Sequence, residues 1–314
     1  MFRCPLATAL GIALALLAPC AAAQTLRPQA AEVAPDTWMV QGLSALGSPA
    51  NRNFISNAAF VVTRDGVVVV DALGSPALAQ ELLAEIRRIT PAPVRYVIVT
   101  HYHADHVYGL QAFKAAGATI VAHRDGQLYL NSDTAALRLQ ASREELAPAV
   151  DANTRLVAAD RWIDGPTTIR LGGVDFLLQP AGPAHTPEDL VVWVPKHKLL
   201  LAGDIVFRGR VPFVGQADSG RWIGALDKLL SFDAQVIVPG HGPVSTSARA
   251  DLELTRDYLK YLRQAMGEAA RNMDPFEEAY ARTDWSRFDK LPLFGVANRI
   301  NAYNTYLLME QGGK

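Results

Sequence analysis

Three histidines and one aspartate stand within six residues, in the order His101-Tyr102-His103-Ala104-Asp105-His106. Residues two apart in an extended segment point the same way, so His101 and His103 can bind one ion. Asp105 and His106 start the predicted helix that follows, where they can face a neighbouring position. Such a cluster has a chance frequency on the order of 10⁻⁴ in a chain of this length. The spacing therefore predicts a metal site.

Three further residues of the same chemical types stand where predicted strands end. His185 lies beyond a strand that ends near residue 179, Asp204 follows the run 199–202, and His241 follows the run 235–238. Ligands at the ends of several strands form one site along the edge of a sheet. With the first cluster they make five histidines and two aspartates, enough for two cations.

Imidazole and carboxylate ligands suit zinc, iron or manganese. Two such ions about 3.5–4 Å apart can share a water and lower its pKa toward 7, which makes hydroxide available to attack a carbonyl or phosphoryl group. We therefore expect a hydrolase that needs no serine triad.

The elements that must position these residues alternate between strands and helices. The runs 57–62 and 67–71 predict a hairpin, and the run 94–100 predicts a buried strand that leads into the histidine cluster. Further strands are predicted at residues 118–122, 167–171, 174–179, 190–194, 198–202 and 235–238. Helices are predicted at residues 75–89, 105–116, 221–231 and from about 244 onward. Near the end of the chain, the apolar pattern of Ile300, Tyr303, Tyr306 and Leu307 predicts a docked helix. Two paired sheets with helices outside would satisfy this order.

The first 23 residues resemble a cleaved secretory leader, with Arg3 before an apolar run and three alanines at residues 21–23. The apolar run is too short for a membrane span, and the proline before Cys20 departs from a lipoprotein signal. We therefore expect a periplasmic or secreted protein with a single domain over residues 24–314. Both cysteines, Cys4 and Cys20, lie in the leader, so the mature chain would have no thiol ligand or nucleophile.

The composition excludes several classes of protein. The 314 residues include 30 Lys+Arg and 31 Asp+Glu, and half of the residues are apolar. This balance excludes a disordered chain and gives no basic surface for nucleic acid. We expect a small-molecule substrate, no nucleic acid and no membrane association after removal of the leader; the sequence predicts no particular oligomeric state.

The order and spacing of these motifs closely resemble those of the metallo-β-lactamase-fold hydrolases, over about residues 37–244. The resemblance implies an α/β fold, a four-layer αββα sandwich, with a binuclear metal site for two Zn²⁺, or alternatively iron or manganese. It implies that Asp204 bridges the metals, that Asp105 and Asp204 are catalytic, and that Asp71 orients a ligand. The implied ligands of the first metal are His101, His103 and His185, and those of the second are Asp105, His106 and His241.

Asp204 also separates branches of this family. An aspartate at this position resembles glyoxalase-like thioesterases, lactonases and phosphodiesterases more than β-lactamases. The leader and the segment 185–193 resemble a periplasmic branch associated with quinoprotein or sulfur-oxidation systems. We expect cleavage of an ester, thioester, lactone or amide; β-lactam hydrolysis and a mononuclear-iron sulfur dioxygenase are the alternatives.

The remaining candidates have ordinary structural interpretations. His197 is expected to be a solvated turn residue and His123 a structural residue near the site. Tyr102 and Tyr108 are expected to pack rather than to line a pocket. The loops 45–57 and 124–160 are expected to carry substrate selectivity. Loop residues with a possible recognition role are Asn53, Phe54, Phe207, Arg208 and Trp222.

Overall fold

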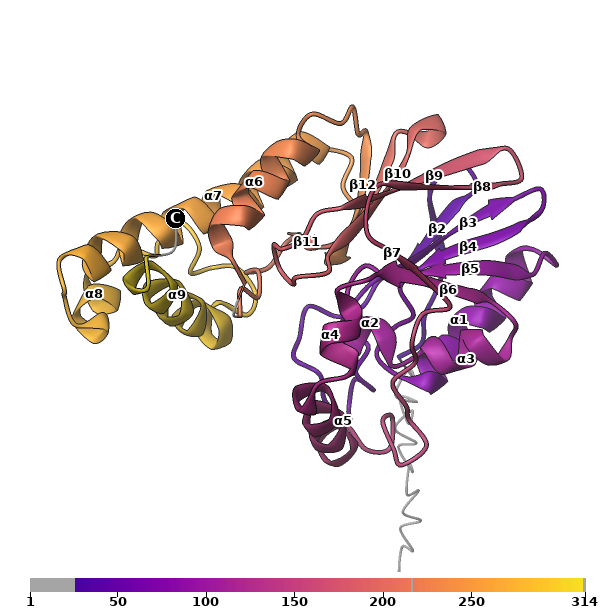
Figure 1. Cartoon of the computed structure of the whole chain (residues 1–314), viewed down its shortest axis with the longest axis horizontal. Helices are drawn as coiled ribbons and strands as arrows, with labels where there is room; N and C mark the ends of the chain where they lie inside the picture. The colour runs from indigo at the N-terminus through magenta and orange to yellow at the C-terminus, as the bar shows by residue number, and fades with distance from the viewer. Residues whose placement is uncertain (1–25, 216, 313–314) are drawn as a thin grey trace, which may run out of the picture.

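Two β-sheets pack face to face, with helices on the outer side of each (Figure 1). The computed structural model describes residues 26–215 and 217–312, so the predicted leader lies outside the described residues. One apolar core fills the space between the sheets, and a second and third lie between each sheet and its helices. The predicted αββα sandwich is confirmed.

The first sheet has seven strands in sequence order, beginning with antiparallel neighbours and becoming parallel from β4 onward. Its central strands are buried on both faces and rich in valine, as expected for parallel strands covered by helices. The strands are β1 (Ala31–Ala34), β2 (Thr37–Val40), β3 (Ala58–Thr63), β4 (Gly66–Val70), β5 (Val94–Ile98), β6 (Thr119–His123) and β7 (Arg161–Ile163).

The second sheet has five strands in the order β12-β11-β10-β9-β8, with only the β11 and β12 pair parallel. Its strands are β8 (Thr167–Leu171), β9 (Val174–Pro180), β10 (Leu190–Val194), β11 (Leu199–Phe207) and β12 (Val236–His241). The turn between β10 and β11 is a 3₁₀ helix, η1 (Pro195–His197).

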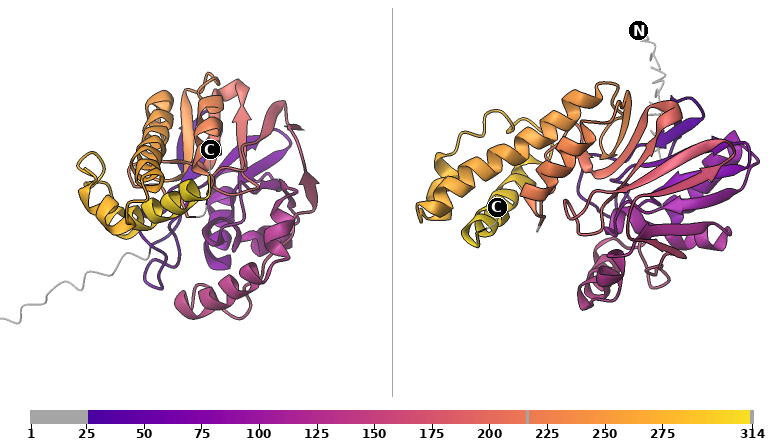
Figure 2. Two further views of the ribbon diagram at one scale, coloured as in Figure 1. Left: turned by 60° about the vertical axis from the view of Figure 1, so that its left-hand side comes forward. Right: turned by 45° about the horizontal axis from the view of Figure 1, so that its top comes forward.

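The helices divide between the two outer faces. On the side of the first sheet, apolar residues of α1 and α3 bury themselves against β3, β4 and β5. On the other side, α6 and α7 cover the second sheet, and α8 and α9 pack on α7 to form an arm that extends away from the sandwich (Figures 1 and 2). The helices are α1 (Pro76–Ile89), α2 (Ala104–Val107), α3 (Leu110–Ala115), α4 (Gly126–Leu130), α5 (Asp133–Glu145), α6 (Ser219–Leu229), α7 (Ala248–Arg271), α8 (Phe276–Arg282) and α9 (Phe294–Glu310). None of the described helices combines the length and apolar character that a membrane span requires.

The single helix predicted over residues 105–116 is wrong, because α2 and α3 are separate. The chain between them approaches the end of β4, where the Gly109 amide donates to the Leu73 carbonyl at 3.1 Å. A Cβ on Gly109 would lie 1.9 Å from the Ala72 carbonyl oxygen. This close backbone approach explains the break, and it leaves α2 as a short turn that carries Asp105 and His106.

The strands that lead to Asp204 and His241 are longer than predicted. Asp204 lies within β11, where the register to β12 shifts between Leu201 and Gly203 and again before Phe207. His241 is the last residue of β12. The irregular pairing distorts β11 at this point. Asp204 therefore lies in a distorted strand rather than in the loop after it.

The predicted docked helix is α9, but only part of its predicted apolar set faces inward, since Tyr306 is buried and Leu307 packs against the core. Ile300 and Tyr303 are 46% and 44% exposed, whereas Asn298 and Asn301 are fully buried. The Asn298 Oδ1 accepts from the Tyr258 hydroxyl at 2.8 Å, and Asn301 donates to that hydroxyl at 2.9 Å. Specific hydrogen bonds, and not hydrophobic periodicity alone, therefore decide which face of α9 is inside.

Candidate metal centre

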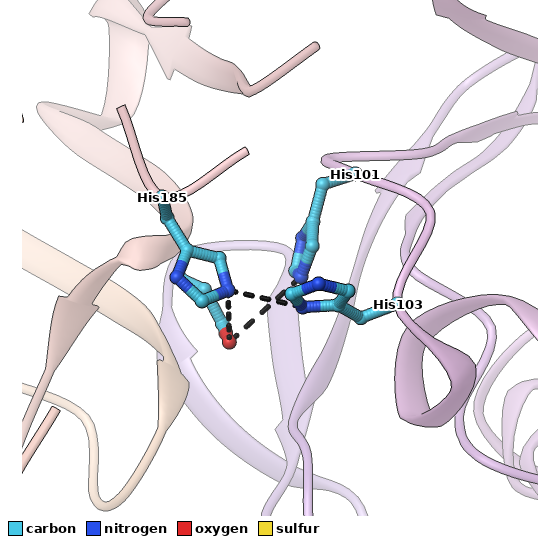
Figure 3. Close-up of side chains that lie close together, drawn as sticks. His101, His103 and His185 are labelled. Carbon is cyan, nitrogen blue, oxygen red and sulfur yellow. Dashed lines mark hydrogen bonds and ion pairs between the residues drawn. The ribbon is translucent and has the colours of Figure 1, made fainter. Parts of the chain in front are cut away.

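The first group of predicted ligands converges at the edge where the two sheets meet. His101 and His103 follow β5, and His185 lies in the turn between β9 and β10. Their side chains point toward one another (Figure 3), with Nε2 of His185 3.0 Å from Nδ1 of His103. One potential ligand atom from each of these histidines and from Asp204 lies within 4.8 Å of all the others.

The second group consists of Asp105, His106 and His241, whose ligand atoms also lie within 4.8 Å of one another. Nε2 of His241 is 3.3 Å from Oδ2 of Asp105 and 3.3 Å from Oδ2 of Asp204. Asp204 thus faces both groups, because Oδ2 is also 3.4 Å from Nε2 of His185 and Oδ1 is 3.2 Å from Nε2 of His106. The structure brings all seven predicted residues together.

The donor atoms fit a metal centre. Nε2 of His101, Nε2 of His106 and Oδ1 of Asp204 are buried and have no hydrogen-bond partner among the described residues. Buried polar atoms without partners are rare and costly in folded proteins. Cations held by the two groups would satisfy all three atoms, and nitrogen and carboxylate oxygen are the ligands that zinc accepts.

The electrostatics of the first group favour neutral ligands. Burial lowers the pKa of His101 and of His103, and burial together with the nearby His103 lowers the pKa of His185 to about 3. These three imidazoles are therefore uncharged at neutral pH. A neutral imidazole has the lone pair that a metal requires.

The carboxylates in and beside the second group favour a bound cation. Burial lowers the pKa of His106 and of His241, but the nearby carboxylates, Asp204 first and Asp105 after it, together outweigh this effect and raise both pKa values above the ordinary value. Burial likewise opposes ionisation of Asp105, yet His106 and His241 hold the pKa of that carboxyl below its usual range. A dication bound here would meet ionised carboxylates and would displace the imidazole protons.

Hydrogen bonds fix the outer nitrogens of the imidazoles. Nδ1 of His106 lies 2.8 Å from Oδ2 of Asp71, which also accepts from the Thr100 hydroxyl at 2.8 Å. Nδ1 of His241 lies 2.7 Å from the Ile55 carbonyl oxygen, so this nitrogen carries the proton. Both rings consequently present Nε2 to the cluster. Asp71 has the orienting position that the resemblance implies.

Two residues that support the site have no motif of their own in the sequence. The Asn57 side chain donates to the Pro239 and Gly242 carbonyls at 2.8 Å each and so holds the turn that bears His241. Gly240 lies so close to Asp204 that a Cβ would be 1.9 Å from Oδ1. The role of Asn57 is visible only in the three-dimensional contacts. For Gly240, the sequence signal is its place directly before His241.

A cleft of about 610 Å³ opens onto the cluster. Both predicted selectivity loops contribute to it, the first through Leu46 and Asn53 and the second through Tyr129 and Arg138. Phe207 and Arg210 line it from the end of β11, and Phe207 stacks on His241 with ring centroids 5.1 Å apart. Sequence reasoning missed Arg210.

The other sequence candidates lie apart from the cluster. His197 is in the turn η1, and Nδ1 of His123 accepts from the Asp125 amide at 3.3 Å. Tyr102 packs on Trp162, and the Tyr108 hydroxyl bonds Ser142. These positions agree with the structural interpretations.

Three of the candidate recognition residues have structural roles instead. Arg208 and Trp222 contact other parts of the fold, and Phe54 lies in the apolar core. Arg208 pairs with Asp251 at 2.9 Å, and Trp222 is buried with its ring 5.2 Å from that of His185. Phe54 belongs to the apolar core against the first sheet.

The family model of the metallo-β-lactamase superfamily matches residues 51–241, more than half of the chain. Among curated proteins, a linear primary-alkylsulfatase of Pseudomonas sp. (strain ATCC 19151) is 27% identical over 235 residues, covering 63% of this chain and 44% of the relative. A type 2 metallo-β-lactamase of Bacillus sp. (strain 170) is 29% identical over 194 residues, covering 60% of this chain and 67% of the relative.

Among solved structures, a sec-alkylsulfatase from Pseudomonas sp. has a TM-score of 0.72 at 18% identity. The match covers 89% of this chain and 50% of the sulfatase chain. A metallo-β-lactamase from Pontibacter korlensis has a TM-score of 0.60 at 23% identity and covers 74% of this chain and 99% of its own. The chain thus spans about half the length of the alkylsulfatases that it matches. Together with the arrangement of the seven residues, the family match shows that this chain belongs to the metallo-β-lactamase superfamily.

Proposed function

We propose that this protein is a hydrolase with a dinuclear metal site, most simply two Zn²⁺. The observation that carries the proposal is the position of Asp204, whose two oxygens lie 3.2–3.4 Å from ligand nitrogens of both groups. A carboxylate so placed can bridge two cations. His101, His103 and His185 would hold the first cation, and Asp105, His106 and His241 the second.

A pair of bound dications supplies Lewis acidity and a nucleophilic water at neutral pH. The chain's own contribution is to place and orient. Asp105 is a ligand candidate that also lines the cleft, so its carboxylate can orient the water and receive its proton. Asp71 fixes His106, and the burial of the cluster excludes bulk water from the ligands.

For the substrate we propose an ester, thioester, lactone or amide. β-Lactam cleavage is an alternative supported by the relatives that are metallo-β-lactamases. Sulfate-ester hydrolysis is a second candidate, supported by the alkylsulfatase match in both sequence and fold. The completeness of the second ligand group favours hydrolysis over a mononuclear-iron dioxygenase, which would leave Asp105, His106 and His241 without a function.

We also propose export to the periplasm or secretion, on the strength of the leader-like first 23 residues. N-terminal sequencing of the protein recovered from the periplasm of an expressing bacterium tests this. A start at Gln24 would support the proposal, and an intact Met1 on cytoplasmic protein would contradict it.

The test of activity is a panel of chromogenic substrates with zinc-loaded protein. The panel contains 4-nitrophenyl butyrate, a thioester, a lactone, a chromogenic cephalosporin and 4-nitrophenyl sulfate. Turnover of any of these that is lost on chelation and restored by zinc supports hydrolysis, and the preferred member selects among the candidates. Oxygen uptake by iron-loaded protein without any hydrolysis would instead contradict the proposal.

A further inference from the structure

The cleft above the metal site contains a buried arginine with unused donors. Arg210 stands just beyond β11 and is only 7% exposed, yet it lines the same cleft as Asp105, Asp204 and His241. Its guanidinium lies over the ring of Phe207, 5.4 Å from the centroid, which covers one of its faces.

Few hydrogen-bond acceptors among the described residues face the guanidinium of Arg210. Its Nε donates to the Val211 carbonyl at 3.3 Å, and Nη1 lies 3.3 Å from Nδ1 of His241. That nitrogen already carries the proton directed at the Ile55 carbonyl, so it has no lone pair for the arginine. Only one of about five N–H groups therefore has an acceptor among the described residues.

No described carboxylate forms an ion pair with Arg210. The other charged pair of the cleft, Arg138 and Glu145, is satisfied within itself at 3.3 Å. Asp105 and Asp204 face the metal site, where two dications would outweigh their charge. A buried cation without a counter-ion is unfavourable, so the structure leaves a place for an anion to be supplied from outside.

The arginine is also held in position before any ligand arrives. The Val211 amide donates to the Pro292 carbonyl at 3.1 Å, just before α9. Asn301 of α9 donates to the Pro212 carbonyl at 2.7 Å and accepts from the Val214 amide at 2.9 Å. The helix that fixes this loop lies beyond the residues that the family model matches. A guanidinium fixed in this way loses little freedom on binding.

We propose that Arg210 binds an anionic group of the substrate, a carboxylate or a sulfate, and so determines which compounds the metal site accepts. The planar fork of a guanidinium matches both groups with two parallel hydrogen bonds. The inference rests on the proposed function, because it places the anion within the cleft of the metal site. It makes Arg210 a specificity-determining residue rather than a metal ligand.

The test compares three probes of similar length, hexanoate, hexyl sulfate and the neutral hexanamide, by calorimetric titration into zinc-loaded protein. We expect the wild-type protein to bind at least one of the two anions more tightly than the amide. Arg210→Gln should weaken binding of that anion about 10- to 100-fold, as for loss of hydrogen bonds to a charged group, and leave hexanamide unchanged. Arg210→Lys, which keeps the charge but not the fork, should restore part of the affinity.

The control is Arg170→Gln, which removes an exposed arginine paired with Asp175 outside the cleft and should change anion binding less than twofold. Loss confined to hexyl sulfate points to a sulfate ester as substrate, and loss confined to hexanoate points to a carboxylate-bearing one. Equal weakening of all three probes, or anion binding that Arg210→Gln leaves intact, overturns the inference. Zinc content and hydrolysis of neutral 4-nitrophenyl butyrate, measured on the same samples, report separately on the proposed function.

Discussion

Three of the five ligand imidazoles, those of His101, His106 and His241, are held from outside so that one nitrogen faces inward. Asp71 fixes His106, the Ile55 carbonyl fixes His241, and the Thr100 hydroxyl lies 3.0 Å from Nδ1 of His101. Such outer partners set the tautomer and the aim of a metal-binding histidine. The inward atoms then meet around Asp204, which lies between both groups.

Replacement of Asp204 by Ala should reduce turnover by at least about a thousandfold, since it removes the carboxylate that faces both ligand groups. Circular dichroism should show an unchanged fold. The matched control is His197→Ala, a histidine in the turn η1 that should leave turnover within twofold of wild type. Near-wild-type activity of Asp204→Ala would contradict a bridging role.

Replacement of Asp71 by Asn should weaken zinc binding about 10- to 100-fold, because His106 loses the charged partner that orients it. Competition with a chromophoric chelator measures the affinity. Asp175→Asn, which removes an exposed aspartate paired with Arg170, serves as the control. Unchanged zinc affinity in Asp71→Asn would show that the aspartate has no such role.

The motif predicts the seven candidate ligands because their chemistry requires particular residue types at fixed spacing. Arg210 and Asn57 could not be predicted in this way. An arginine in a loop has the same sequence signature whether it is solvated or buried, and only the packing of Phe207 against it reveals the difference. Asn57 acts through hydrogen bonds to residues more than 180 positions away.

Among the elements, α9 has the most unexpected role. Its polar residues point inward to hold the loop of residues 208–215, while Ile300 and Tyr303 remain outside. Hydrophobic periodicity predicts the helix and the burial of Tyr306, but it does not predict the buried asparagines, since the rule does not include hydrogen bonds to distant backbone. The same limit explains the break between α2 and α3, which results from close contact of Gly109 with the end of β4.

Replacement of Asn301 by Ala should loosen this loop while leaving the metal ligands in place. Loss of hydrogen bonds to buried backbone groups should cost about 1–3 kcal/mol of stability, and binding of the preferred anionic probe should weaken. Arg299→Ala, on the exposed side of α9, is the control. Anion affinity and proteolytic sensitivity of the loop equal to wild type would show that α9 does not position Arg210.

At the scale of the whole molecule, the metal site connects the two sheets. The first sheet contributes His101, His103, Asp105 and His106, and the second contributes His185, Asp204 and His241. A metal bound between them connects both halves of the sandwich and stabilises the folded chain by mass action.

Zinc at a hundredfold excess over its dissociation constant should stabilise the fold by about 2.7 kcal/mol, and in a chain of this size this raises Tm by about 4 °C. Thermal melting before and after chelation measures the effect. A chelated protein that melts at the same temperature as the zinc-loaded one would contradict a structural link between the sheets.

The metal content of the purified protein tests the dinuclear site most directly. Plasma mass spectrometry of zinc-loaded protein, after removal of free metal, should give two zinc ions per wild-type chain. His241→Ala, which removes a ligand of the second group only, should give one. One ion per chain in the wild type, or the same content in wild type and His241→Ala, would contradict two metals bridged by Asp204.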